Sequence, residues 1–214
     1  RWYLILGENV RWWARKYFEF IGPIPSFTEE EVPDRTKARH ELGVDDETKA
    51  IIISLGGTRA GKELISIAKY LRDEISKYFN DVKVFLASGP RAGLNVNSLD
   101  GVEVINKPYS LYEVIAGADC VITLAGLTTV TELLVLGIPA ILLPLKGHYE
   151  QEENARMAMS IRDGFIIADL DGVDPRELAI YVKQLLSMPR PKQMRDLLKN
   201  SEKVALSVLD VLNG

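Results

Sequence analysis

Residues suited to holding a diphosphate and a sugar gather at the start of one predicted helix. Gly126 follows an apolar, strand-like segment and lets the chain turn into a helix predicted over 128–136. Thr128 and Thr129 bring hydroxyls and backbone amides to that helix start, where the helix dipole favours an anion. Glu132, one turn further on the same face, could accept both hydroxyls of a ribose. A capping box, with Thr129 as N-cap and Glu132 three residues later, explains the same spacing without a ligand.

A glycine-rich loop at 56–63 follows another apolar segment and again leads into a predicted helix. Its glycines would let backbone amides approach a phosphate. The loop nearly matches the P-loop pattern Gly-x4-Gly-Lys, but Glu63 stands where a Ser or Thr would hold Mg²⁺. The loop could therefore bind a phosphate without being a P-loop. Two alternatives stay open: a degenerate P-loop nucleoside triphosphatase, and a tight turn that binds nothing.

Glu150 and Gln151 open a third predicted helix, over 150–161, and offer donors and acceptors for sugar hydroxyls. The alternative is an acidic first turn that complements the helix dipole. His148, in the preceding loop, could act as a general base, although loop histidines are more often solvated than catalytic. This segment is therefore a candidate sugar contact.

The elements that must position these loops alternate between strand and helix. Apolar, β-branched runs without polar alternation predict strands buried on both faces, as in parallel sheets. We expect strands over 51–55, 82–87, 102–105, 120–124, 140–143 and 165–168, and helices over 62–79, 110–116, 128–136, 150–161, 174–186 and 192–212. This order predicts an α/β fold, a doubly wound parallel sheet with Rossmann-like connections, whose ligands bind at the carboxyl ends of the strands.

The N-terminal stretch lacks this regular alternation. A strand over 3–6 and a helix over 8–20 precede a segment punctuated by proline and glutamate, and a short helix is expected over 36–42. We predict three parts: 1–21 as the last strand and helix of a preceding N-terminal domain, 22–34 as an interdomain linker, and 35–214 as a nucleotide-binding domain. The first residue is Arg1, and we expect the chain to be a piece of a longer protein.

Trp12 lies off the apolar face of its predicted helix, close in sequence to Trp2 and Trp13. A lone exposed aromatic residue is ordinary, but a cluster of this kind favours a covered surface. We expect it to contact the absent domain or a separate subunit.

The composition bounds the class of protein. Of 214 residues, 47% are hydrophobic and 26% are charged, which is typical of a globular protein and excludes disorder. The net charge of −4 and the lack of a Lys/Arg-rich run argue against nucleic acid as a partner. Cys120 is alone, so an intrachain disulfide is excluded, and no apolar run reaches the roughly 18 residues of a membrane span. We expect a cytoplasmic protein.

A set of short motifs resembles one known family. The motifs are Gly56-Gly57-Thr58, the run Ala-Gly-Leu-Thr-Thr-Val-Thr-Glu at 125–132, Gly137-Ile138-Pro139-Ala140, Glu150-Gln151 and Asn154-Ala155. Together they resemble the C-terminal domain of family 28 glycosyltransferases, of the MurG type, over roughly 22–214. The resemblance implies one Rossmann-like half of a GT-B enzyme, which binds a UDP-sugar donor, UDP-N-acetylglucosamine or a similar one, without a metal or other cofactor.

The resemblance also implies which residues contact the donor: Gly57, Thr58, Lys107, Tyr109, Gly126, Leu127, Thr128, Thr129, Glu132, Glu150 and Gln151. By position, Glu132 would hold the ribose, the residues from 126 to 129 the diphosphate, and 150–151 the sugar, with Thr58 near the phosphates. The segment 107–109 would pair with uracil through its backbone. Pro108 has no N–H, so the amide of Tyr109 would have to serve there.

The same resemblance implies inverting transfer to an acceptor hydroxyl. In this family the general base comes from the N-terminal domain, so no catalytic residue is expected in this chain. The partner would be that acceptor-binding domain or a separate subunit, and through it the protein would sit at the inner face of the membrane. Leu124 stands where plant and animal relatives carry a histidine. A non-catalytic nucleotide-binding module and a nucleotide-sugar 2-epimerase stay open as alternatives.

Overall fold

Six strands form one parallel sheet within the part of the chain that the structure describes. The structure is a computed structural model and describes residues 8–54, 56, 61–87, 101–105 and 110–213. The strands are β1 (Lys49–Ser54), β2 (Val82–Ala87), β3 (Val102–Ile105), β4 (Cys120–Thr123), β5 (Ala140–Leu142) and β6 (Phe165–Ile167). Their order is β3-β2-β1-β4-β5-β6, and every neighbouring pair is parallel. The predicted doubly wound sheet is confirmed.

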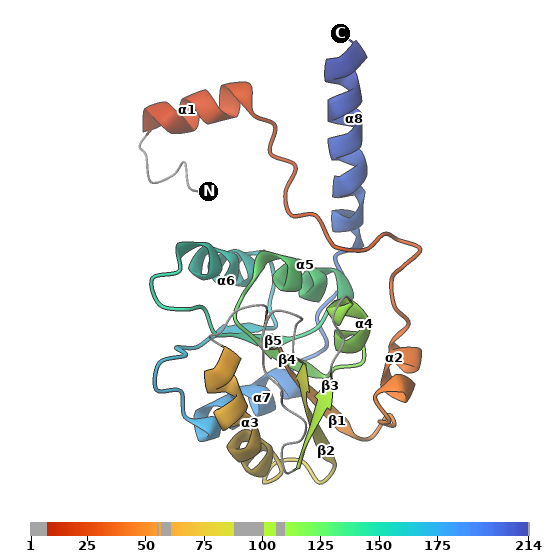
Figure 1. Ribbon diagram of the computed structural model, residues 1–214, viewed down its shortest axis with the longest axis vertical. Helices are drawn as coiled ribbons and strands as arrows, with labels where there is room; N and C mark the ends of the chain where they lie inside the picture. Colours follow the sequence, from red (N-terminus) through yellow and green to blue (C-terminus); the bar gives the residue numbers. More distant parts are fainter. Residues whose placement is uncertain (1–7, 55, 57–60, 88–100, 106–109, 214) are drawn as a thin grey trace.

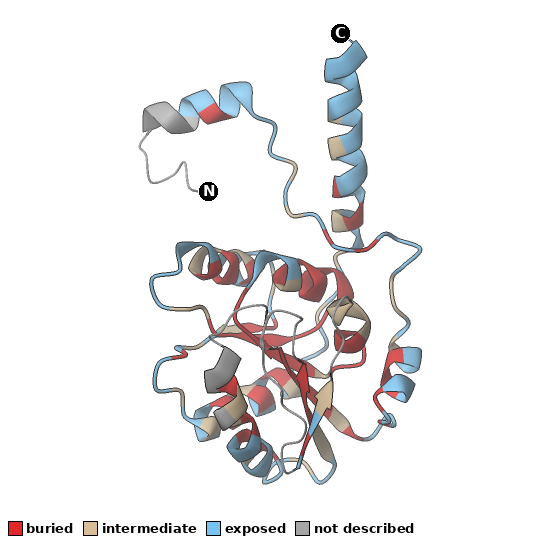
Figure 2. Cartoon of the chain, in the orientation of Figure 1, coloured by how far each residue is buried: buried red, intermediate tan, exposed pale blue. Residues whose placement is uncertain are grey.

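Helices cover both faces of this sheet (Figure 1). They are α3 (Gly61–Ile75), α4 (Leu111–Ile115), α5 (Leu127–Leu136), α6 (Tyr149–Ile161) and α7 (Pro175–Ser187). Side chains of α3 and α7 share one buried cluster with Ile51 and Ile53, whereas α4, α5 and α6 share another with Ala50 and Ile52. Successive residues of β1 therefore face opposite layers, and both layers are buried (Figure 2).

The segment between α1 (Glu8–Tyr17) and α2 (Arg35–Glu41) forms no helix or strand, as its prolines predict. It nevertheless packs on the sheet domain. The buried Phe27 ring lies 4.5 Å, centre to centre, from the ring of Tyr112 on α4. Asn200 Nδ2 donates to the Pro23 carbonyl at 2.8 Å. The linker is therefore anchored at both of these points.

The prediction of one helix over 192–212 is wrong in two respects: the helical segment starts later, and its first turn is a 3-10 helix. A 3-10 helix, η2 (Arg195–Lys199), precedes α8 (Asn200–Asn213), and 189–194 is not helical. Pro189 and Pro191 cannot donate backbone hydrogen bonds, and the Met194 N–H bonds the Leu134 carbonyl of α5 instead of a helical partner. Packing against α5 therefore overrides the helical periodicity here.

α1 and α8 stand away from the sheet layers (Figure 1). The residues of both helices are mostly exposed in the described part (Figure 2). The helix predicted over 8–20 ends at Tyr17, and the strand predicted over 3–6 lies outside the described residues. Among the described helices, none has the length and apolar character needed to cross a membrane.

Candidate functional site

The strand order reverses between β1 and β4, which are hydrogen-bonded neighbours. The connections that leave the carboxyl ends of these two strands run to opposite sides, and the crevice between them is where open α/β sheets bind ligands. Residues 124–126 connect β4 to α5 at this point. The first sequence-predicted site therefore lies at the switch point of the sheet.

The N-terminus of α5 is open. Gly126 is the N-cap residue, no side chain caps the helix, and the first helical bond runs from the Val130 N–H to the Gly126 carbonyl. Gly126, Leu127 and Thr128 are exposed. The amides of the first turn lack intrahelical acceptors and carry the positive end of the helix dipole, so they suit an anion.

The capping-box alternative is wrong. Thr129 lies inside the first turn of α5 and is not its N-cap residue, because the cap falls three residues earlier at Gly126. The Glu132 carboxylate accepts a hydrogen bond from Ser26. The spacing of Thr129 and Glu132 therefore needs another explanation than local capping.

Ala125 enters α5 with a positive φ of 60°, a conformation that side-chain-bearing residues rarely adopt. Its carbonyl accepts a hydrogen bond of 3.1 Å from Nδ2 of the buried Asn154 on α6. This contact joins two of the predicted site segments, the loop before α5 and the first half of α6. Strained backbone held by surrounding contacts is common at ligand sites. The motif Asn154-Ala155 pointed to this residue, but its role emerges only from the fold.

Glu132 lies one turn inside α5 and is buried, with only 4% of its surface exposed. Its Oε1 accepts a hydrogen bond of 2.5 Å from the Ser26 hydroxyl, across 106 residues of sequence. Burial raises the pKa of this carboxyl from 4.5 to about 7, although the bond from Ser26 lowers it. The carboxylate expected to hold a ribose hydroxyl thus holds a hydroxyl of the linker. Nothing in the local sequence pointed to Ser26.

Gln151 and Glu150 differ in their surroundings at the start of α6. Gln151 is buried, and its Oε1 accepts a hydrogen bond of 2.9 Å from the Leu145 N–H, which fixes the loop before the helix. His148 caps the helix through Nδ1, at 3.5 Å from the Gln151 N. Glu150 is exposed. The Gln151 oxygen therefore has an internal partner in the loop before α6.

The remaining predicted contacts, Gly57, Thr58, Lys107 and Tyr109, lie outside the described residues.

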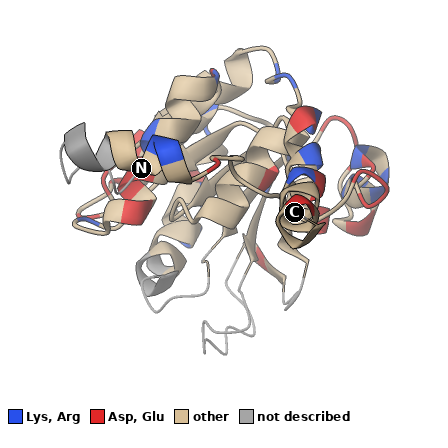
Figure 3. Ribbon diagram, turned by 90° about the horizontal axis from the view of Figure 1, so that it is seen from above, with Lys and Arg blue, Asp and Glu red and all other residues tan. Residues whose placement is uncertain are grey.

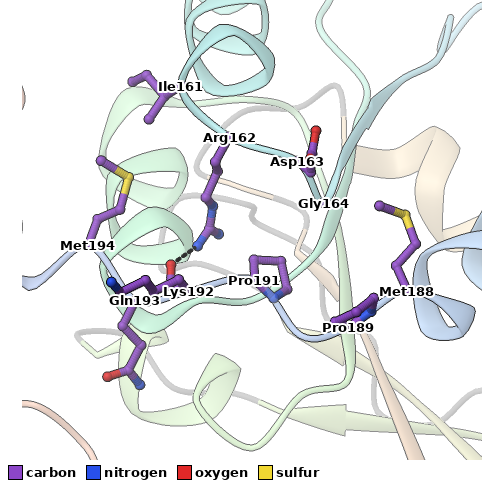
Figure 4. A pocket seen from close by; sticks show the side chains of 10 residues that line it. All are labelled: Ile161, Arg162, Asp163, Gly164, Met188, Pro189, Pro191, Lys192, Gln193 and Met194. Carbon is purple, nitrogen blue, oxygen red and sulfur yellow. Dashed lines mark hydrogen bonds between the residues drawn. The ribbon is translucent and has the colours of Figure 1, made fainter.

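A cavity of about 430 Å³ lies near β6, the strand at one end of the sheet order, and Gly164, which precedes β6, lines it (Figure 4). Arg162 lines it and donates to the carbonyls of Leu133 at 2.9 Å and Lys192 at 2.8 Å. The guanidinium therefore satisfies the carbonyl end of α5 and ties the segment before η2 to it. This cavity is remote from the open start of α5.

Comparison with known proteins identifies the fold and the family. The family model described as the glycosyltransferase family 28 C-terminal domain matches residues 51–208, which include most of β1, the switch point and most of α8. The chain belongs to this family. It is 26% identical over 176 residues to an uncharacterised glycosyltransferase of Methanopyrus kandleri, with 81% of this chain and 48% of that protein covered.

A named relative is the UDP-N-acetylglucosamine–N-acetylmuramyl-(pentapeptide) pyrophosphoryl-undecaprenol N-acetylglucosamine transferase of Ruminiclostridium cellulolyticum. It is 30% identical over 183 residues, with 79% of this chain and 48% of that protein covered. The chain spans about half the length of the curated relatives it matches.

Solved structures share the fold. The glycosyltransferase of kitacinnamycin matches with a TM-score of 0.60 and 22% identity, over 86% of this chain and 44% of that one. Acinetobacter baumannii MurG matches with a TM-score of 0.50 and 22% identity, over 78% of this chain and 46% of that one. The sheet domain is one Rossmann-like half of the GT-B fold.

Proposed function

We propose that this family 28 domain binds a UDP-linked sugar, UDP-N-acetylglucosamine or a similar one, as the donor half of a glycosyltransferase. The observation that carries the proposal is the open N-terminus of α5 at the switch point, with Glu132 one turn deeper. The relatives named as N-acetylglucosamine transferases support this choice of donor. The diphosphate would lie over the amides of residues 127–129, and the ribose would reach Glu132.

The chemistry of transfer follows from the same geometry. When an acceptor hydroxyl attacks the anomeric carbon, negative charge develops on the departing diphosphate. Amides and a helix dipole fixed in place stabilise that charge without reorganisation. In this proposal they replace a metal ion as the source of positive potential, and Glu150 and Gln151 contact the sugar.

The acceptor-binding half is proposed as the partner, and it would supply the general base. Large apolar side chains are exposed on the two projecting helices, and they are Trp12, Trp13, Tyr17, Leu206, Val208, Leu209, Val211 and Leu212. Exposed apolar side chains gathered in this number support an interface on these two helices. The match covers 48% of each of the two relatives from Methanopyrus kandleri and Ruminiclostridium cellulolyticum, so we propose that a second domain covers these side chains.

The two helices lie over different parts of the sheet domain when it is seen from above (Figure 3). Arg15 and Lys16 end α1, with the Lys16 Nζ 5.0 Å from the centre of the Trp12 ring. Basic residues beside aromatic ones also suit an anionic membrane surface. On this ground we propose that the assembled enzyme lies at the inner face of the membrane. The 214 residues alone are expected to bind donor without transferring it, and measured transfer by the chain alone would contradict this.

Calorimetric titration tests the donor proposal. We expect UDP and UDP-N-acetylglucosamine to bind without added metal, and ADP to bind more weakly. Glu132→Ala should weaken UDP binding about 10- to 100-fold, since hydrogen bonds to a charged group are lost. Glu202→Gln, an exposed glutamate on α8, is the matched control and should bind as the parent chain does. Binding of ATP with Mg²⁺ that depends on Lys62 would instead indicate a P-loop protein.

A further inference from the structure

The linker residue Ser26 donates a hydrogen bond to one oxygen of the Glu132 carboxylate, Oε1. Its Oγ lies 2.5 Å from Oε1 of Glu132, and Ser26 itself is exposed. The buried Glu132 carboxyl is therefore only one side chain below the surface, and that side chain is Ser26. The group that donates this hydrogen bond to Glu132 is a hydroxyl.

The linker presents this hydroxyl in a fixed position. Pro25 and Phe27, on either side of Ser26, are both buried, and Phe27 packs against Tyr112. Ser26 and Phe27 lie in a bend, and the two buried neighbours of Ser26 hold this part of the linker against the sheet domain. The contact with Glu132 follows from this anchoring and is not a chance rotamer of a free loop.

A serine hydroxyl and a ribose hydroxyl offer a carboxylate the same kind of donor. We propose that Ser26 competes with the ribose of the nucleoside diphosphate for Glu132, so that donor binding requires the linker hydroxyl to leave. This inference rests on the proposed function, because it assumes that Glu132 is the ribose acceptor.

The linker position and donor binding affect each other. Binding free energies are reciprocally coupled, so a linker position that withdraws Ser26 strengthens donor binding, and a bound donor favours that linker position. Ser26 thus makes the occupancy of the donor site depend on the segment that joins α1 to the sheet domain.

The test compares Ser26→Ala with the parent chain in titrations with UDP and with 2′,3′-dideoxyuridine diphosphate, which lacks the hydroxyls that would replace Ser26. Ser26→Ala should tighten UDP binding about tenfold, as expected when one hydrogen bond to a charged group no longer has to break. The dideoxy analogue leaves Ser26 in place, so its affinity should be the same for both proteins.

Ser207→Ala is the matched control. Its hydroxyl donates to Glu19 Oε2 at 2.8 Å, which is a serine–glutamate contact between the N-terminal segment and α8, away from Glu132. Its UDP affinity should equal that of the parent chain. Unchanged or weaker UDP binding by Ser26→Ala, or equal tightening for the two ligands, would overturn the competition. Absence of UDP binding to the parent chain and to Ser26→Ala would overturn the proposed function itself.

Discussion

The buried carboxyl of Glu132 predicts a specific dependence of stability on pH. Below pH 4.5 the group is neutral in the folded and the unfolded chain. Between pH 4.5 and about 7 the unfolded chain ionises, whereas the folded chain keeps the proton because burial has raised the pKa. The folded chain binds more protons in this window, so its stability falls as pH rises and stays lower above pH 7.

The magnitude follows from the two pKa values. Each pKa unit corresponds to about 1.4 kcal/mol, so a rise from 4.5 to about 7 amounts to a loss of about 3 kcal/mol. Glu132→Gln is neutral at every pH and can still accept from Ser26. It should match the parent chain near pH 4.5 and exceed it by about 3 kcal/mol above pH 7, or roughly 6–12 °C in Tm for a chain of this size.

Urea unfolding at pH values from 4.5 to 8 measures this difference. All other ionisable groups are common to both proteins and cancel in the comparison. Glu150→Gln removes an exposed glutamate at the start of α6 and should follow the parent chain. Ser26→Ala removes the bond that lowers the Glu132 pKa, so the pKa of this carboxyl should rise further. The stability of the Ser26→Ala variant should therefore keep falling to a higher pH than that of the parent chain. Parallel profiles for Glu132→Gln and the parent chain would refute the reasoning.

Three further outcomes are expected from the same contacts. Binding of UDP-N-acetylglucosamine should tighten about tenfold between pH 6 and 8, because the Glu132 carboxyl with a pKa of about 7 must ionise, and titrations of Glu132→Gln should show no such trend. Asn154→Ala removes the bond to the Ala125 carbonyl and should lower the unfolding free energy by about 1–3 kcal/mol in urea while weakening UDP binding; normal UDP affinity would contradict the role of that loop. Gly137→Ala places a Cβ 2.5 Å from the Pro191 carbonyl oxygen at a φ of +68°, and a loss of roughly 2–4 kcal/mol is expected in the same assay, against no loss if the segment simply moves.

The regular part of the fold was predictable because its signals are local. Buried strands such as β1 and β2 are continuous apolar runs, and Gly137, in the left-handed conformation, ends α5 as its position predicts. The position of the start of α5 was predictable for the same reason, within one residue. The capping box was not excluded from sequence, because the turn at Ala125 depends on Asn154 of another helix.

The contacts that decide the state of the site are not local. Ser26 and Glu132 are 106 residues apart, and neither sequence segment shows a pattern that pairs them. The non-helical segment 189–194 and the 3-10 form of η2 likewise depend on burial of Leu198 and on the bond from Met194 to α5, which outweigh helical periodicity. Sequence periodicity therefore located the elements of the candidate site, but tertiary packing determined which side chains meet there.

The burial of Glu132 lowers the stability of the free chain above pH 4.5 and strengthens the hydrogen bonds that the carboxylate accepts. Desolvation disfavours the ionised carboxylate in the free chain, which is why its pKa rises. The same low-dielectric surroundings strengthen any hydrogen bond that the carboxylate accepts once a donor hydroxyl is in place. A more exposed glutamate would destabilise the fold less and hold a ribose more weakly. In our proposal, a ligand that brings its own hydroxyls would replace the hydroxyl of Ser26 at the Glu132 carboxylate.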